Sequence, residues 1–182
     1  MKNPILLALC LSLFLLAGCE IAPTKPSLIT SEKYIEMTYA ASDHLISQLR
    51  ARGVYKDNSE PILVATLVNL DELESSSRLG RSISEQVASR LTQQGFKVIE
   101  VKLRGTLYVK KSEGEMLLSR EVANIGKSYK APAVIVGTYA PATNFVAINL
   151  KVVSAESQLA IAATDYGLPL DENIRQLLLS GR

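Results

Sequence analysis

The chain has 182 residues, with 20 Lys and Arg, 18 Asp and Glu, and a formal net charge of +2. This nearly neutral balance gives no basic footprint for nucleic acid, and the absence of tryptophan argues against sites that stack sugars or bases. With two cysteines and one histidine, a zinc site or a catalytic triad built on those residues lacks the partners it needs.

The chain begins with the features of a bacterial lipoprotein signal. Lys2 supplies a positive charge, and residues 5–16 are almost entirely apolar. The tetrapeptide LAGC at residues 16–19 has the form that is cut before its cysteine, which is then acylated. The apolar run is shorter than the roughly 20 residues that span a bilayer. We therefore predict a signal peptide at 1–18 and lipidation at Cys19; an ordinary secretory signal with a coincidental cysteine is the alternative.

The predicted lipid anchor indicates in which compartment of the cell the protein lies. A lipoprotein cysteine carries two or three acyl chains, and two are enough for stable anchoring. Glu20 follows the cysteine, and the lack of aspartate there favours export to the outer membrane, facing the periplasm. No cofactor is expected besides the covalent lipid on Cys19. Because Cys10 leaves with the signal, the mature chain has 164 residues and no free thiol or disulfide.

Residues 19–30 are predicted to form a lipidated tether, and residues 31–182 a single domain. Pro23 and Pro26 oppose a helix in the tether, whose last eleven residues would reach roughly 36 Å when extended. The alternative is that this stretch packs on the domain.

The first part of the domain reads as a helix followed by a strand. Thr30 or Ser31 would cap the helix and Gly53 would end it. Its apolar stripe at helical spacing is Tyr34, Met37, Ala41, Leu45 and Leu49. Residues 62–68 are nearly all apolar, which predicts a strand covered on both faces.

The middle of the chain alternates helices and strands. After a serine-rich turn at 73–77, a second helix is expected at 79–94, with Gly95 after its end. Its apolar stripe is Leu79, Ile83, Val87 and Leu91. Residues 96–103 form a mixed, charged strand that suits a sheet edge. A third helix is expected at 115–129.

The last part begins with a buried strand at 133–139. A hairpin follows, with strands at 146–152 and 159–163 that are covered on one face. The expected inward positions are Val146, Ile148, Leu150, Val152, Leu159, Ile161 and Ala163. Asp171 would cap a short final helix.

These elements predict an α/β (α+β) fold with one mixed five-stranded sheet and helices packed on it. Right-handed crossovers make the first three strands parallel neighbours. The two most apolar strands, 62–68 and 133–139, belong at the centre, and the charged strand 96–103 at the edge. With the strands numbered in chain order, the expected sheet order is 2-1-3-4-5, with strands 4 and 5 antiparallel.

One loop, residues 71–82, carries candidate binding residues. It follows a central strand at its carboxyl end, where ligands bind in open α/β sheets. Its serines, arginines and helix-start amides would suit an anion or a partner. Its acidic residues would repel phosphate, and it lacks the spacing of a nucleotide-binding loop, so helix capping is the simpler interpretation. The candidate residues are Ser75, Ser76, Ser77, Arg78, Gly80 and Arg81.

Four other features of the sequence bear on function. His44 lies at the border of the first helix's apolar stripe, which predicts a helix-surface or boundary histidine rather than a ligand. The insert 104–115 is rich in lysine and glutamate, so we predict a solvated loop rather than a pore strand. The triplet 177–179 and the open face of the hairpin are alternatives for a partner surface; closure of the core is the simpler interpretation for the triplet.

Several stretches together resemble the FlgO family of flagellar outer-membrane lipoproteins. They are ILVATLVNL at 62–70, SSSRLG at 75–80, SEQVASRL at 84–91, GFKV at 95–98 and VGTY at 136–139. The resemblance covers roughly 62–169, and its motifs are signatures of the fold. Curli secretion proteins, peptidoglycan-synthase activators and the amino-terminal domain of TolB share similar strand–helix patterns, so the fold is expected to resemble that TolB domain.

The resemblance implies a non-enzymatic lipoprotein that supports flagellar assembly, stability and motility, as a structural part of a ring around the basal body. Its partners would be the outer membrane through the lipid, basal-body or ring proteins, and further copies of the chain. Only Cys19 carries over as a functional residue. The alternative is a periplasmic adaptor lipoprotein for a peptidoglycan synthase or a secretion complex.

Overall fold

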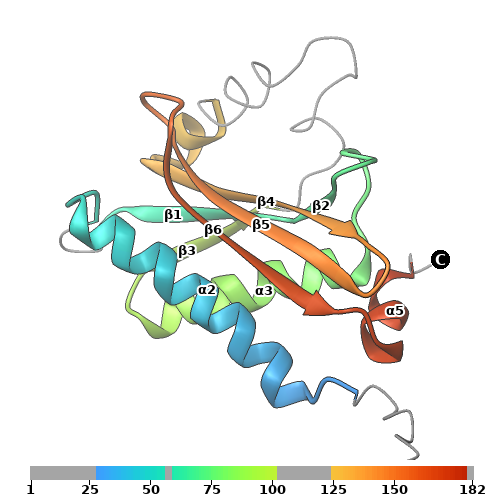
Figure 1. The fold of residues 1–182 in the computed structure, drawn as a ribbon. Coiled ribbons are helices and arrows are strands. Elements are labelled where there is room, and N and C mark those ends of the chain that lie inside the picture. Colours follow the sequence, from blue (N-terminus) through green and yellow to red (C-terminus); the bar gives the residue numbers. More distant parts are fainter. Residues whose placement is uncertain (1–27, 56–58, 102–123, 180–182) are drawn as a thin grey trace, which may run out of the picture.

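The computed structural model describes residues 28–55, 59–101 and 124–179 (Figure 1). The predicted signal peptide, Cys19, most of the predicted tether and the 104–115 insert lie outside the described residues. In chain order the elements are α2 (Ser31–Ala51), β1 (Pro61–Ala65), β2 (Val68–Asn69), α3 (Arg78–Gln93), β3 (Lys97–Val101), a helical segment at 124–129, β4 (Ala133–Pro141), β5 (Phe145–Ser154), β6 (Ala160–Pro169) and α5 (Glu172–Leu178).

The strands form one mixed sheet of order β3-β1-β4-β5-β6, with the short β2 beside β4. Strand β1 is parallel to β3 and β4, and β4, β5 and β6 are antiparallel. Figure 1 shows α2 and α3 side by side on one face. The predicted fold class and the order 2-1-3-4-5 are therefore confirmed.

The predicted strand 62–68 differs from the structure, because a bulge divides it into β1 and β2. Ile62 lies opposite Ala133 and Val68 opposite Thr138, so six steps along one strand match five along β4. The extra residue falls at Thr66–Leu67. A bulge of this kind leaves backbone groups without ladder partners, which other parts of the chain must satisfy.

Both long helices begin and end at residues that the sequence indicated. The Thr30 hydroxyl accepts from Lys33 N at 3.2 Å and caps α2. Gly53 follows α2 and Gly95 follows α3, with φ of 66° and 86°. After Gly95 the chain changes direction, and Phe96 N donates to Leu91 O in the last turn of α3 at 3.1 Å. Glycine is favoured there because it adopts positive φ without a steric penalty.

The core has two parts, one on each face of the sheet. Between the sheet and the pair of helices lies the larger cluster, where the α3 stripe Leu79, Ile83, Val87 and Leu91 is at most 1% exposed. On the opposite face, Ile125 from the helical segment packs against a cluster that includes Leu63, Ala65, Val134 and Val136. The central strands β1 and β4 are thus covered on both faces, as their sequences predict.

The inward positions of β6 correct the expectation for the second hairpin strand. Leu159 and Ala163 are exposed, whereas Ala162, Thr164 and Leu168 are buried. The register shifts between Val152 and Val153 of β5, and Leu159 lies before β6 begins. Because side chains alternate along a strand, a shift of one residue exchanges the two faces.

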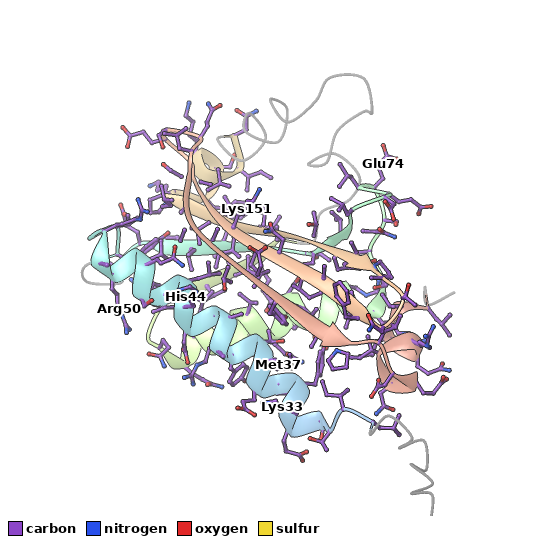
Figure 2. The ribbon with its side chains drawn as sticks, viewed as in Figure 1. Lys33, Met37, His44, Arg50, Glu74 and Lys151 are labelled. Atoms are coloured by element: carbon purple, nitrogen blue, oxygen red, sulfur yellow. The ribbon has the colours of Figure 1, made fainter. Side chains whose placement is uncertain are left out.

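Helix α2 covers β6 through polar contacts that its apolar stripe does not reveal. Thr38 is fully buried, with its hydroxyl 3.0 Å from Tyr166 OH. His44 lies on the helix surface (Figure 2), with Nδ1 3.3 Å from the Thr164 hydroxyl. Gln48 binds both backbone groups of Ala163: its amide nitrogen donates to the carbonyl at 2.8 Å, and its oxygen accepts from N–H at 3.3 Å. An amide in this position occupies part of the strand edge.

The two helices run in parallel and are joined at several points along their length. Near their starts, Tyr34 OH donates to the Ser82 hydroxyl at 3.1 Å. Further along, the Arg90 guanidinium binds both carboxylate oxygens of Asp43 at 2.8 and 2.7 Å. The amino-terminal ends of α2 and α3 therefore lie at the same end of the domain.

We expect Leu91→Ala to lower the free energy of unfolding by about 2–5 kcal/mol, because the truncated side chain leaves a cavity in the larger cluster. Leu159→Ala is the matched control, since Leu159 is 66% exposed and its truncation opens no cavity. Urea unfolding of both variants measures the difference. Equal losses would contradict the division between core and surface described above.

We also expect the domain to lose stability as the pH rises above the usual tyrosine pKa of 10.0. Burial raises the pKa of Tyr34, Tyr55 and Tyr166 above that value. The unfolded chain loses these protons first, so their stabilising contribution is complete below pH 10 and disappears as the pH rises through the folded-state pKa.

Urea unfolding measured from neutral to alkaline pH tests this expectation. Tyr166→Phe should flatten the alkaline decline, because that ring no longer titrates. Tyr129→Phe is the control, since Tyr129 is exposed and should leave the decline unchanged. A decline of the same slope in both variants would show that other groups cause it.

Candidate functional site

The candidate loop joins β2 to α3 at the carboxyl end of the parallel strands (Figure 1). Its first part closes on itself: Asn69 N donates to Ser75 O at 3.0 Å, and Ser75 N to Glu72 O at 2.9 Å. The Ser75 hydroxyl donates to the Glu72 carboxylate at 3.1 Å. Glu74 is exposed on this loop, away from the sheet (Figure 2). The first predicted serine therefore faces an acidic neighbour within its own turn.

Two serines satisfy the backbone at the bulge. Leu67 N donates to the Ser84 hydroxyl at 2.8 Å, and the Ser76 hydroxyl donates to Leu67 O at 2.6 Å. Ser84 lies on the buried face of α3, so one bond ties the helix to the sheet and the other ties the loop to the same residue. These bonds replace the ladder that the bulge interrupts, and they fix where α3 starts.

The start of α3 is also bound to β4. Ser77 caps the helix by accepting from Gly80 N at 3.3 Å, and its own N–H donates to Tyr139 OH at 2.7 Å. Gly80 makes this approach possible: a Cβ there would lie 2.5 Å from Leu67 O and 2.8 Å from the Tyr139 ring. The first turn of α3 therefore lies directly on the backbone of the bulge.

The two arginines of the loop bind different parts of the domain. Arg81 Nη1 donates to Ser76 O at 3.1 Å and so supports the capped turn. Arg78 Nε donates to Leu179 O at 3.4 Å, after the end of α5. Of the six predicted residues, Ser76, Ser77, Gly80 and Arg81 gather around the bulge, whereas Ser75 and Arg78 do not join them. These contacts stabilise the loop; anion or partner binding there stays a prediction.

The first described residues of the chain are held by α5. The Ile29 N–H donates to the Asp171 carboxylate, and Ile29 O accepts from Asn173 Nδ2 at 3.3 Å. Asp171 also caps α5 by accepting from Ile174 N at 2.9 Å. The sequence predicts that cap, but not the bond to Ile29, because 142 residues separate the two. The end of the stretch 19–30 thus packs on the domain, with Ile29 only 9% exposed.

The open depressions of the described surface include the following two. One of about 280 Å³ lies on the sheet face opposite α2 and α3, lined by Leu70, Ala140, Phe145, Ala147 and Gly167 among others. The other, of about 540 Å³, lies near the β5–β6 turn and includes Lys127, Lys130 and Glu156. Within residues 28–55, 59–101 and 124–179, no group of three acidic, histidine or cysteine side chains is placed to bind a metal. None of the helices in these ranges has the length and apolarity needed to span a membrane.

A family model described as FlgO protein matches residues 39–173. The chain belongs to the FlgO family. The resemblance that the sequence motifs indicated is thereby confirmed, over a longer stretch than the motifs themselves cover. No curated protein matches the chain in sequence.

Solved structures share parts of this FlgO-family fold at low identity. The LpoB C-terminal domain from Salmonella enterica is 13% identical, with 70% of this chain and 94% of that chain covered and a TM-score of 0.48. A PelC dodecamer from Paraburkholderia phytofirmans is 12% identical, with 62% and 73% covered and a TM-score of 0.43. Lipoprotein GNA1162 from Neisseria meningitidis is 14% identical, with 63% and 85% covered and a TM-score of 0.40. These likenesses concern the fold and not the partners.

We expect Gly80→Ala to destabilise this FlgO-family domain by about 1–3 kcal/mol, because the added methyl group collides with the Leu67 carbonyl and the Tyr139 ring. Gly167→Ala is the control: its Cβ would lie 3.6 Å from Phe145, an ordinary contact. Thermal unfolding of the two variants measures the difference. If Gly80→Ala unfolds at the same temperature as Gly167→Ala, the start of α3 does not depend on this close approach.

Proposed function

We propose that this chain is a lipoprotein of the outer membrane, anchored through Cys19, that supports the assembly and stability of the flagellum and hence motility. It acts by contact and not by catalysis, as a structural part of a ring around the basal body. The observation that carries this proposal is membership of the FlgO family, over residues 39–173. That match runs from the middle of α2 into α5 and so includes every strand of the sheet.

The predicted signal peptide supports the proposal independently of the family. The LAGC tetrapeptide at 16–19 follows an apolar run of the right length, and Cys19 is the acceptor for the lipid. Ile29, the second of the described residues, is bound to α5 and its cap through both of its backbone groups. Nine residues separate Cys19 from Leu28, so an anchor at Cys19 would hold the domain within roughly 30 Å of the membrane.

The contacts of the loop 71–82 support a role without catalysis. The hydroxyls of Ser75, Ser76 and Ser77 bind groups of the domain itself, at distances of 2.6 to 3.3 Å. A serine that holds a bulge or caps a helix is committed to the fold. The domain then offers partners a fixed surface.

We expect removal of the gene from a flagellated host to give poor swimming and weak or missing flagella. Expression of the Cys19→Ala variant in the deletion strain should not restore swimming, because this variant is not acylated and leaves the membrane. Soft-agar motility, electron microscopy and metabolic labelling with palmitate measure these effects. Cys10→Ser is the control, since Cys10 is removed with the signal and should leave labelling and swimming unchanged.

Two results would count against separate parts of the proposal. Normal motility without the gene would remove the flagellar role, whereas palmitate on Cys19→Ala would remove the assigned anchor. Purification of the chain with its partners from the outer membrane should recover basal-body proteins. Recovery of a peptidoglycan synthase or a secretion complex in their place would favour the adaptor alternative.

A further inference from the structure

Exposed apolar side chains gather at one end of the domain. In the described part of the chain, eight large hydrophobic side chains are exposed. Six of them, each 37–57% exposed, belong to segments at the carboxyl end of the parallel strands: Leu28, Ile35, Leu70, Leu73, Phe145 and Leu179. We call these six the apolar end. The other two, Tyr129 and Leu159, lie toward the opposite end.

On the sheet side, backbone bonds bring the members of the apolar end together. Leu70 N donates to Tyr139 O at 3.0 Å, which places Leu70 beside the last residues of β4. Phe145 begins β5 after the tight β4–β5 turn, and it lines the 280 Å³ depression together with Leu70. Asn144 O accepts from Leu170 N at 2.9 Å, so this turn also lies beside the start of α5.

On the helix side, α5 and the starts of α2 and α3 complete the apolar end (Figure 1). Leu28 precedes Ile29, whose backbone binds Asp171 and Asn173 at the start of α5. Leu179 follows α5 and accepts from Arg78 at the start of α3. Ile35 lies in the first turns of α2, next to Tyr34, which binds the start of α3.

The predicted anchor enters at this same end. Cys19 precedes Leu28 by nine residues, which span no more than roughly 30 Å in any conformation. Helix α2, with its 21 residues, extends away from this end for roughly 32 Å. The β5–β6 turn with Leu159 lies at the far end of that helix, because α2 and β6 run in opposite directions. A short anchor therefore holds the apolar end nearer to the bilayer than the rest of the domain.

We propose that the apolar end docks on the phospholipid surface in which the chain is anchored, with the six side chains in the region between headgroups and acyl chains. This inference rests on the acylation of Cys19 in the proposed function. Exposed apolar side chains at an anchored end bury their surface in the bilayer interface, and such binding scales with the apolar area buried.

The charges at the apolar end indicate which kind of surface it fits. Cations and anions are mixed there, with Lys33 near the start of α2 and Glu74 in the loop, as Figure 2 shows. Among the described residues of this end, the basic ones are Lys33, Arg78, Arg81 and Arg175, and the acidic ones include Glu32, Asp71, Glu72, Glu74 and Glu172. Such a mixture suits zwitterionic headgroups and gives no strong attraction to anionic lipid. Docking is therefore driven by the apolar side chains and is insensitive to salt.

Single-cysteine labelling tests the proposal on the lipoprotein itself, because the mature chain has no free thiol once Cys19 is acylated. Phe145→Cys and Leu179→Cys place a solvatochromic dye at the apolar end. Leu159→Cys is the matched control at the opposite end, and Leu159 is the most exposed of the eight side chains. The purified lipoproteins are reconstituted into vesicles of phosphatidylethanolamine and phosphatidylglycerol, with and without brominated acyl chains.

We expect a blue shift of emission and quenching by brominated lipid at Phe145→Cys and Leu179→Cys, and neither at Leu159→Cys. Raising the salt concentration should leave both signals unchanged. Three results would overturn the docking. All dyes could emit as they do in water, or brominated lipid could quench the dyes at both ends equally. A blue shift without quenching would report contact between copies of the chain and not contact with lipid. Loss of both signals at high salt would show that charge attraction, and not the apolar side chains, holds this end on the vesicle.

Mass spectrometry of the amino-terminal peptide keeps this test separate from the proposed function. An unmodified Cys19 overturns the anchor and the docking together. An acylated chain on vesicles whose dyes all remain in water overturns the docking alone, and leaves the anchor and the flagellar role in place.

Discussion

The close approach of α3 to the bulge at Leu67 is the constraint on which the rest of this structure depends. Without a side chain at Gly80, the first turn of the helix lies against the Leu67 carbonyl and the Tyr139 ring. Ser76 and Ser84 then satisfy the two backbone groups of Leu67. Because the start of α3 is fixed here, the apolar stripe of this helix, from Leu79 to Leu91, packs against the sheet. Helix α2 is joined to α3 through the Arg90–Asp43 pair and to β6 through Gln48.

Features that depend on local sequence were predictable. Apolar runs placed β1 and β4 at the centre of the sheet, and charges placed β3 at its edge, so the strand order followed from right-handed crossovers. Helix starts at Thr30 and Ser77 and helix ends at Gly53 and Gly95 follow from capping preferences that act within a few residues. For the same reason, helix capping was the simpler interpretation of the serines in the loop 71–82, and Ser77 is the one that caps α3.

Features that depend on distant partners were not predictable. The bulge at Thr66–Leu67 lies within an unbroken apolar run, and its register is visible only against β4. The hydroxyl of Tyr139 binds the loop from 62 residues away, and no local pattern marks it. Thr38 is buried because Tyr166 supplies a polar partner, which a stripe of apolar residues cannot indicate. In each case, tertiary contacts decide between local options that are similar in free energy.

The bonds that hold Ile29 have a mechanical consequence. In the proposed function, a pull on the anchor at Cys19 would reach the described part of the domain at Leu28 and Ile29. Here Ile29 is fastened to Asp171 and Asn173, which come from the other end of the chain. Part of such a load would pass through these bonds into α5, whose Ile174 is buried in the larger core cluster. The hydrogen bonds of Ile29 thus join the amino-terminal and carboxyl-terminal segments of the described chain to each other.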